Sequence, residues 1–489
     1  MNLAGAICKQ SALFFITLAL ALKLGKADVG RYAECYALLS LLGLLSLAGL
    51  RGALTRFIAI HLADDDPARL RGTVWLGLGL TLVCSTAIAL ALALSSSLVA
   101  GLFHDPTLRS GLILVALTLP ASALQDAALA ATQGWRSQKA FALIGLIFDP
   151  ISRLLLTVAA ILFGAGLTGA LWALLASSWM GAILAGVSLG RRMRSVPRAS
   201  PVFQLRPLFS FSVISWLSAL AATGLIWVDT LLLGVLSTQE NVGTYTVATR
   251  LVTLAVFVMA PINAAFTPHM AHLSHVGDGP GMSRAYGDAN RWIMRLSMPA
   301  FILLLIFPGD LLEFFGNGFA EGAAVTVILA VGQMVSAAAG PCGTVLNMSG
   351  RVLLSMVDNI GALVLNIALN LWLIPLYGIV GAAVAWSLSL TFANVTKALQ
   401  VRHILGVRSA DAGWLKTFLA AVLAAAAGAL VAWLTSGWLA AVLLGFGAVT
   451  VTFVTALAWL GIGVGDTAIV RSVIGRIGGR LRGRRHSFV

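Results

Sequence analysis

The sequence alternates between long apolar runs and short polar segments. Fourteen apolar runs can be counted, and each is near or above the ~20 residues that an α-helix needs to cross the hydrocarbon core of a bilayer. They cover approximately residues 10–24, 32–60, 74–98, 108–132, 140–163, 167–189, 208–236, 245–272, 292–312, 323–348, 353–374, 379–399, 415–434 and 438–460. Backbone groups cannot remain unpaired in lipid, so all the runs are predicted to be helices.

Composition supports lipid as the solvent. The chain of 489 residues is 59% hydrophobic and 10% charged, with a mean hydropathy of +0.95. A soluble protein of this length cannot hide so much apolar surface. The net charge of +14 would suit nucleic acid, but the basic residues lie in short loops between apolar runs, so no nucleic-acid partner is predicted. No metal-ligand spacing or nucleotide-binding motif is apparent, and no cofactor is predicted.

The loop charges predict the orientation of the bundle. Basic residues cluster in alternate loops, at Arg69, Arg71, Arg136, Lys139, Arg191, Arg192, Arg194, Arg198, Arg206, Arg284, Arg291, Arg351, Arg402, Arg408 and in the tail. The intervening loops contain Lys26, Arg31 and Arg109 as their clear cations. Because cytoplasmic loops carry the excess of Lys and Arg, both termini are predicted to be cytoplasmic and the number of spans to be even.

An internal repeat emerges at an offset close to 212 residues. Gly30 and Tyr32 recur as Gly243 and Tyr245, and Gly169 recurs as Gly381. The sequence therefore predicts an internal duplication. The predicted fold class is an all-α polytopic membrane protein with 14 transmembrane helices, in two pseudo-symmetric six-helix lobes plus two extra C-terminal helices. The expected parts are lobes 1–190 and 208–400, a basic cytoplasmic linker 191–207, helices 13 and 14 at 413–462, and a basic cytoplasmic tail 463–489.

Several local patterns match one family of membrane transporters. They are Gly30-Arg31-Tyr32 leading to residues 49–56, Asp229 ahead of residues 242–245, Phe315-Gly316, and residues 373–383. In these patterns the chain resembles the oligosaccharide flippases, the polysaccharide-export branch of the multidrug/oligosaccharidyl-lipid/polysaccharide exporter superfamily. The resemblance implies transfer of an undecaprenyl-diphosphate-linked oligosaccharide from the cytoplasmic to the periplasmic leaflet, for lipopolysaccharide, capsule or exopolysaccharide synthesis. It also implies a bacterial inner-membrane protein that works by alternating access and is not an enzyme.

This task requires a shielded polar cavity with cations for the diphosphate and hydroxyl or amide groups for the sugar. Charges inside membrane helices are costly, so each of them is treated as a candidate. Asp229 and Arg250 are expected at matching depth on adjacent antiparallel helices. They form either a structural ion pair or a gate, in which Arg250 binds diphosphate in one state and Asp229 in the other.

Further charged candidates lie in the first half of the chain. Asp149 and Arg153 are four residues apart on one helix, where they can pair, and Asp149 is also within possible reach of Asp126. Arg51 is predicted to face the cavity, because it lies too deep to reach water easily. Arg56 matches an arginine that recurs in the family, and it either lines the cavity or extends to the interface.

Three asparagines form a polar stripe on the eleventh predicted helix. Asn359, Asn366 and Asn370 fall on one helical face. An amide both donates and accepts hydrogen bonds, so the stripe suits sugar hydroxyls. The alternative is hydrogen bonding between helices, which is frequent in membrane bundles.

Two other functions are considered. A cation-coupled small-molecule or multidrug exporter of the same superfamily is the first, although the run 10–24 lacks the acid that such exporters commonly carry in their first helix. A glycan polymerase or ligase is the second, but the loops near 98–107 and 309–322 are too short for a catalytic surface. The expected partners are the lipid-linked substrate, anionic membrane lipids at the basic tail, and a glycan polymerase of the same pathway.

Overall fold

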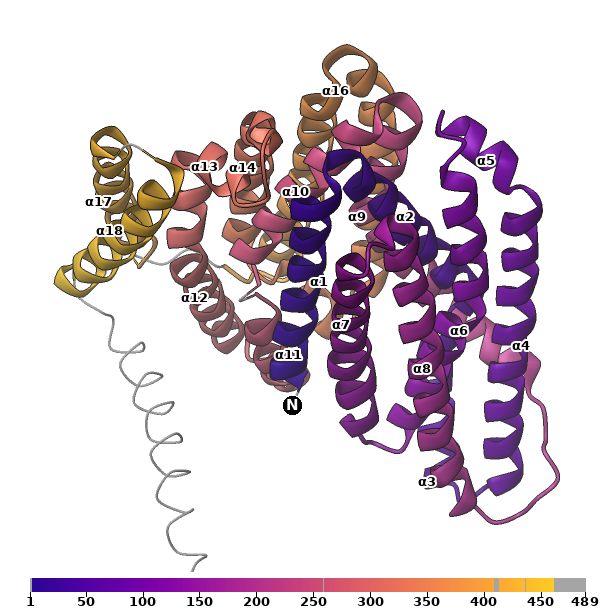
Figure 1. The fold of residues 1–489 in the computed structure, drawn as a ribbon. Coiled ribbons are helices and arrows are strands. Elements are labelled where there is room, and N and C mark those ends of the chain that lie inside the picture. Colours follow the sequence, from indigo (N-terminus) through magenta and orange to yellow (C-terminus); the bar gives the residue numbers. More distant parts are fainter. Residues whose placement is uncertain (1, 258, 409–412, 436, 461–489) are drawn as a thin grey trace, which may run out of the picture.

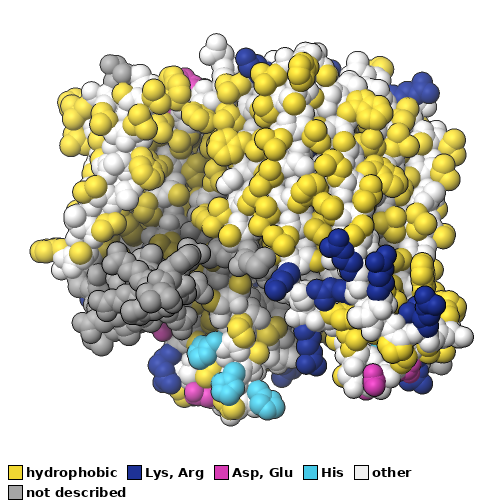
Figure 2. All heavy atoms as spheres, turned by 60° about the horizontal axis from the view of Figure 1, so that its bottom comes forward, with side chains coloured by type: hydrophobic (Ala, Val, Ile, Leu, Met, Phe, Trp, Pro, Cys, Tyr) yellow, Lys and Arg dark blue, Asp and Glu magenta, His cyan; other side chains and the backbone are white. Residues whose placement is uncertain are grey.

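The computed structural model describes residues 2–257, 259–408, 413–435 and 437–460, and these residues form a helical bundle (Figure 1). Eleven described helices are long and apolar enough to cross a membrane, and counting each bent pair as one span raises the number to thirteen. Hydrophobic side chains cover the flank of the molecule, whereas Lys and Arg gather near one end (Figure 2). The prediction of an all-α polytopic membrane protein is therefore confirmed.

The first half of the chain folds around one central helix. Its elements are α1 (Asn2–Leu24), α2 (Lys26–Leu47), α3 (Leu50–Ala63), α4 (Pro67–Leu94), α5 (Ser96–Leu102), α6 (Leu108–Gly134), the π-helix η1 (Phe141–Phe148), α7 (Asp149–Leu162) and α8 (Gly166–Arg194). Helix α6 packs against α2, α3, α4 and α8, and α1 packs against α7. The boundary predicted between the apolar runs 140–163 and 167–189 is present, since α7 ends at Leu162 and α8 begins at Gly166.

The second half adds a second group of packed helices. They are α9 (Leu205–Leu236), α10 (Gln239–Ala255), α11 (Met259–Val276), α12 (Gly279–Ile306), α13 (Pro308–Glu313), the 3-10 helix η2 (Phe319–Gly322), α14 (Ala323–Ala339), α15 (Cys342–Met348) and α16 (Val352–Ile404). Helices α17 (Gly413–Leu434) and α18 (Trp438–Trp459) pack on each other and on α12, at the left edge of Figure 1. The predicted basic tail at 463–489 lies outside the described residues.

Helix breaks divide some predicted runs and leave others joined. The run predicted at 32–60 is bent by 42° between α2 and α3, where Ala48 and Gly49 adopt left-handed backbone conformations with φ of 43° and 75°. Conversely, the runs predicted at 353–374 and 379–399 are the two arms of α16, which kinks at Gly378 with φ of 56°. Glycine lacks the Cβ that makes positive φ costly, so it permits both changes of direction.

The two halves meet where α2 packs along α9 and α10, a contact that we call the seam. Gly30 and Gly243, which the repeat offset pairs, approach each other here. A methyl group on Gly30 would lie 2.1 Å from the carbonyl oxygen of Gln239, and one on Gly243 would lie 2.0 Å from that of Lys26. The backbones of α2 and α10 are therefore in direct contact, which only glycine allows.

Candidate functional site

A cavity of about 370 Å³, which we call the main cavity, lies among the helices of the first half of the chain. Helices α1, α2, α3, α6, α7 and α8 and the π-helix line it, and among its described side chains α9 contributes Thr223. Its uncharged polar lining consists of Tyr36, Ser40, Ser122, Gln125, Ser178 and Thr223. Hydroxyl and amide groups of this kind bind sugar hydroxyls or water.

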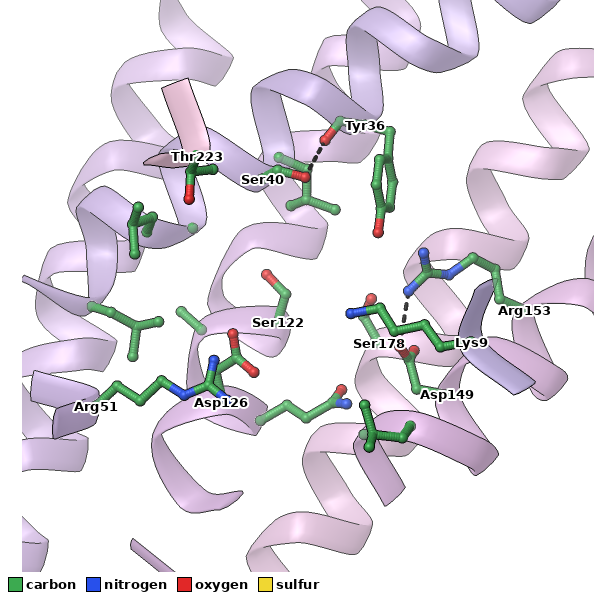
Figure 3. A pocket seen from close by; sticks show the side chains of 18 of the residues that line it. Lys9, Tyr36, Ser40, Arg51, Ser122, Asp126, Asp149, Arg153, Ser178 and Thr223 are labelled. Carbon is green, nitrogen blue, oxygen red and sulfur yellow. Dashed lines mark hydrogen bonds and ion pairs between the residues drawn. The ribbon is translucent and has the colours of Figure 1, made fainter. Parts of the chain in front are cut away.

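Charged side chains converge on the main cavity from separate helices. The cations are Lys9 from α1, Arg51 from α3 and Arg153 from α7, and the acids are Asp126 from α6 and Asp149 from α7. Lys9 and Arg51 extend into the space from opposite sides (Figure 3). Three cations against two acids give the lining a net positive charge, so the cavity favours an anionic ligand.

Asp149 and Arg153 form the ion pair that their spacing predicted. Arg153 Nη2 donates to Asp149 Oδ2 at 2.9 Å, and both side chains are largely buried. The guanidinium of Arg153 also lies over the ring of Tyr36, 5.3 Å from its centroid. The π-helix directly before Asp149 sets this end of α7, and π-helical turns are frequent at functional sites.

A second cavity of about 570 Å³ shares Leu44, Leu47, Arg51 and Thr223 with the main cavity. Arg56 lines this second cavity, together with Gln133 and Trp216. Arg51 belongs to both cavities and lies over the ring of Phe141 at 5.4 Å. The two cavities thus adjoin at Arg51, and Arg56 lines the second of them.

Arg250 lines neither cavity, and the ion pair considered between Arg250 and Asp229 is not formed in this conformation. The guanidinium of Arg250 lies over Trp227, 5.7 Å from the ring centroid. The ring of Trp227 in turn packs edge to face on the ring of Tyr36, with 5.4 Å between the ring centroids. The guanidinium of Arg153 lies over the same Tyr36 ring. A ladder of cation–π and aromatic contacts therefore runs from Arg250 across the seam to the main cavity.

Asp229 is bound instead by two of the predicted asparagines. Its Oδ1 accepts hydrogen bonds from Asn366 Nδ2 at 2.8 Å and from Asn370 Nδ2 at 2.6 Å. All three side chains are buried, with exposed fractions of 1% or less. In this conformation Asn366 and Asn370 therefore join α16 to α9 and do not line either cavity, which is the alternative that the sequence left open.

The third asparagine of the stripe has a different partner. Asn359 Oδ1 accepts a hydrogen bond from Lys397 Nζ at 2.5 Å, which links the two arms of α16. Lys397 is itself buried, so this bond satisfies a cation inside the bundle. All three asparagines thus form hydrogen bonds within the bundle, but with different partners.

The sequence analysis did not single out every charge inside the bundle, and Lys9 and Glu34 are two that it missed. Lys9 lines the main cavity but precedes the first apolar run, so a search for charges inside the runs does not find it. Glu34 is completely buried in α2 and stands inside the second apolar run. The rule that singled out Asp126 and Asp229, an acid within a predicted span, applies equally to Glu34.

Solved structures of a flippase and of a multidrug transporter share this arrangement of helices. The fold superposes on a structure described as "Lipid II flippase MurJ, inward closed conformation" with a TM-score of 0.73 and 13% identity, covering 92% of this chain and 97% of that one. A structure described as the inward-facing conformation of a multidrug resistance MATE family transporter of the MOP superfamily gives a TM-score of 0.66 at 14% identity, covering 83% and 98% of the two chains. The fold is therefore MurJ- and MATE-like.

Sequence comparison identifies the family. The model of the family described as "Polysaccharide biosynthesis protein" matches residues 3–274, and the MatE model matches residues 215–372. The chain belongs to the polysaccharide biosynthesis protein family of the MOP superfamily, a family of transporters and not of enzymes.

Two curated relatives come from the archaeon Haloferax volcanii. The chain is 28% identical over 215 residues to the "Probable low-salt glycan biosynthesis flippase Agl15", covering 43% of this chain and 45% of that protein. It is 29% identical over 196 residues to the "Probable flippase AglR", covering 38% and 40%. The matched stretches thus span less than half the length of either relative.

Proposed function

We propose that the protein is a flippase for a lipid-linked oligosaccharide, with undecaprenyl diphosphate as the lipid carrier. The convergence of Lys9, Arg51 and Arg153 on one shielded cavity carries the proposal. A diphosphate needs several hydrogen-bonding cations once it leaves water, and Arg provides bidentate contacts to phosphate oxygens. Both Haloferax relatives are named as probable flippases, and the name of one of them refers to glycan biosynthesis, which supports the same class of activity.

The sugar part of the substrate finds matching groups in the same space. Hydroxyls of Ser40, Ser122, Ser178 and Thr223 surround the cations. Asp126 and Asp149 offset most of the positive charge of the cavity in the absence of ligand. This lowers the free-energy cost of burying the three cations while the cavity holds no substrate. In this proposal the lipid tail remains in the bilayer while the head group crosses inside the protein.

We further propose a topology of fourteen spans with both termini in the cytoplasm of a bacterial inner membrane. Division of α16 at Gly378 adds one span to the thirteen counted above, because its 53 residues are about 80 Å long at 1.5 Å per residue. The lobes would be 1–190 and 208–400, joined by the linker 191–207. Opening and closing of the seam between them would give alternating access.

A cation-coupled multidrug exporter is the second candidate, because the MatE model matches residues 215–372. The charge of the main cavity separates the two candidates. A cavity lined by an excess of acids would favour a cationic drug. The lining of the main cavity instead has more cations than acids. An anionic substrate is therefore the better fit.

Binding of undecaprenyl diphosphate to the purified protein tests the proposal. Native mass spectrometry in detergent would compare the wild-type chain with Lys9→Gln and Arg51→Gln, using Arg109→Gln, an exposed cation outside both cavities, as the matched control. We expect each cavity variant to weaken binding at least tenfold, corresponding to about 1.4 kcal/mol for a charge-assisted contact. Equal binding by all four proteins would refute the assignment of the main cavity as the diphosphate site.

A further inference from the structure

Glu34 is a carboxylate buried in the seam, and the proposed substrate site does not use it. Its exposed fraction is 0%. It projects from α2 toward α9, where a methyl group on Gly234 would lie 2.3 Å from its Oε1 atom. The side chain of Gln239 approaches it from α10. Three helices from the two halves of the chain thus enclose one acid.

Among the residues that the structure describes, no cation forms an ion pair with this acid. Neither carboxylate oxygen of Glu34 has a hydrogen-bond partner that meets ordinary geometry. Arg31, one turn earlier on α2, is already bound to Asp105 at 2.6 Å and to Asp28 at 2.8 Å. Lys26 pairs with Glu321 at 2.8 Å. Both cations on this part of α2 are therefore engaged by other carboxylates.

The surroundings of Glu34 reinforce its isolation. Burial pushes the pKa of Asp105 upward, but hydrogen bonds donated by Thr107 and by the guanidinium of Arg31 outweigh that effect and hold its pKa below the ordinary value. Asp105 therefore stays ionised and paired with Arg31, so Arg31 is not available to Glu34. The other nearby groups are Cys35 on α2, Gly234 on α9 and Gln239 on α10, and none of them is a cation.

We propose that Glu34 is a proton-binding site that couples protonation to opening of the seam. An ionised carboxylate without a partner is strongly disfavoured in a dry interior, whereas the protonated acid is tolerated there and can donate to an amide oxygen. Glu34 is thus protonated while α2 packs on α9 and α10. Separation of these helices admits water, and the acid then releases its proton.

The coupling follows from linkage. A ligand that binds one of two conformations more tightly shifts the population toward it, and here the proton binds the closed seam more tightly. Low pH therefore favours the closed seam and high pH favours the open one. For a single proton, the ratio of open to closed molecules changes by up to about tenfold per pH unit. The inference rests on the proposed function only in treating the seam as a moving contact.

Distances across the seam, measured without substrate, test the inference. Spin labels would be attached to Ser110→Cys and Glu240→Cys, which are exposed at the same end of the two halves, in a protein whose four native cysteines are replaced. The full-length protein in nanodiscs would be titrated from acid to alkaline pH. We expect the long-distance population of the wild-type background to grow as the pH rises.

Glu34→Gln, which imitates the protonated acid, should keep the short distance at every pH. Glu313→Gln removes an exposed acid and should titrate like the wild-type background. Infrared spectroscopy supplies a second measurement, because the carbonyl band of a protonated carboxylic acid should be present at neutral pH and lost in Glu34→Gln. A background whose distances do not depend on pH, or a Glu34→Gln protein that titrates normally, would overturn the inference. Failure of undecaprenyl diphosphate to bind would affect only the proposed substrate.

Discussion

At the scale of single residues, the bundle separates two kinds of charge. Some charges are held by partners inside the bundle, as Asp229 Oδ1 is by Asn366 and Asn370. Others face a polar space, as Lys9 and Arg51 face the main cavity. Only the second kind remains available to a ligand, because a partner bond must otherwise be broken before a new one forms.

Asp229→Ala should lower the stability of the folded protein, and its effect on transport should be secondary. The substitution leaves two buried amide groups without their acceptor, and such loss costs about 1–3 kcal/mol. Thermal unfolding in detergent would show this as a lower midpoint temperature. Glu313→Ala, at an exposed acid, is the control and should leave the midpoint unchanged. Equal midpoints for the two variants would contradict the role of Asp229 as the hydrogen-bond acceptor between α9 and α16.

Arg250→Ala should lower glycan export while leaving a folded protein in the membrane. Arg250 begins the aromatic ladder that crosses the seam, and a cation–π contact of this kind contributes about 1–2 kcal/mol when it is shielded from water. Arg250→Lys should recover part of the export, since it keeps the charge but loses the planar guanidinium. The measurement is surface glycan beside membrane abundance. Normal export by a well-expressed Arg250→Ala protein would exclude this role.

At the scale of helices, glycine positions decide where the chain bends and where helices touch. Gly49 and Gly378 hold left-handed backbone conformations at the bends, whereas Gly30 and Gly243 permit backbone contact across the seam. The first pair sets the direction of a helix, and the second sets the distance between helices.

Gly243→Ala should favour the open seam. Its methyl group would lie 2.0 Å from the carbonyl oxygen of Lys26, and overpacking of this kind costs about 1–3 kcal/mol. The spin-label distance described above should lengthen at a pH where the wild-type seam is closed. Gly79→Ala is the matched control, because nothing lies within 4 Å of the added methyl group on α4. If both variants keep the wild-type distance, the glycine contact does not control closure.

At the scale of the whole molecule, the distribution of loop charges predicts which end faces the cytoplasm. A cysteine at Glu240 should react with a membrane-impermeant reagent added to intact cells, and one at Ser200 should react only after the cells are opened. Both positions are exposed, so accessibility of the side chain does not limit the reaction. Labelling of the Ser200 position in intact cells would invert the proposed topology.

The sequence by itself determined the helical membrane class and the family. Long apolar runs leave a lipid-embedded chain no alternative to helices, and those runs are a local property. The i,i+4 spacing of Asp149 and Arg153 likewise predicted a pair that is formed at 2.9 Å. Interactions within one helix follow from its fixed geometry, so they can be read along the chain.

Partners on different helices were decided only by the tertiary structure. Asp229 and Arg250 were expected at matching depth from their positions in the sequence, yet Asp229 faces α16 and Arg250 faces Trp227. Depth follows from position along a helix, but the rotation of each helix about its axis is set by packing against all its neighbours. For the same reason Lys9 and Glu34 acquire their roles from helices that are distant in sequence, one facing a cavity and the other enclosed without a counter-charge.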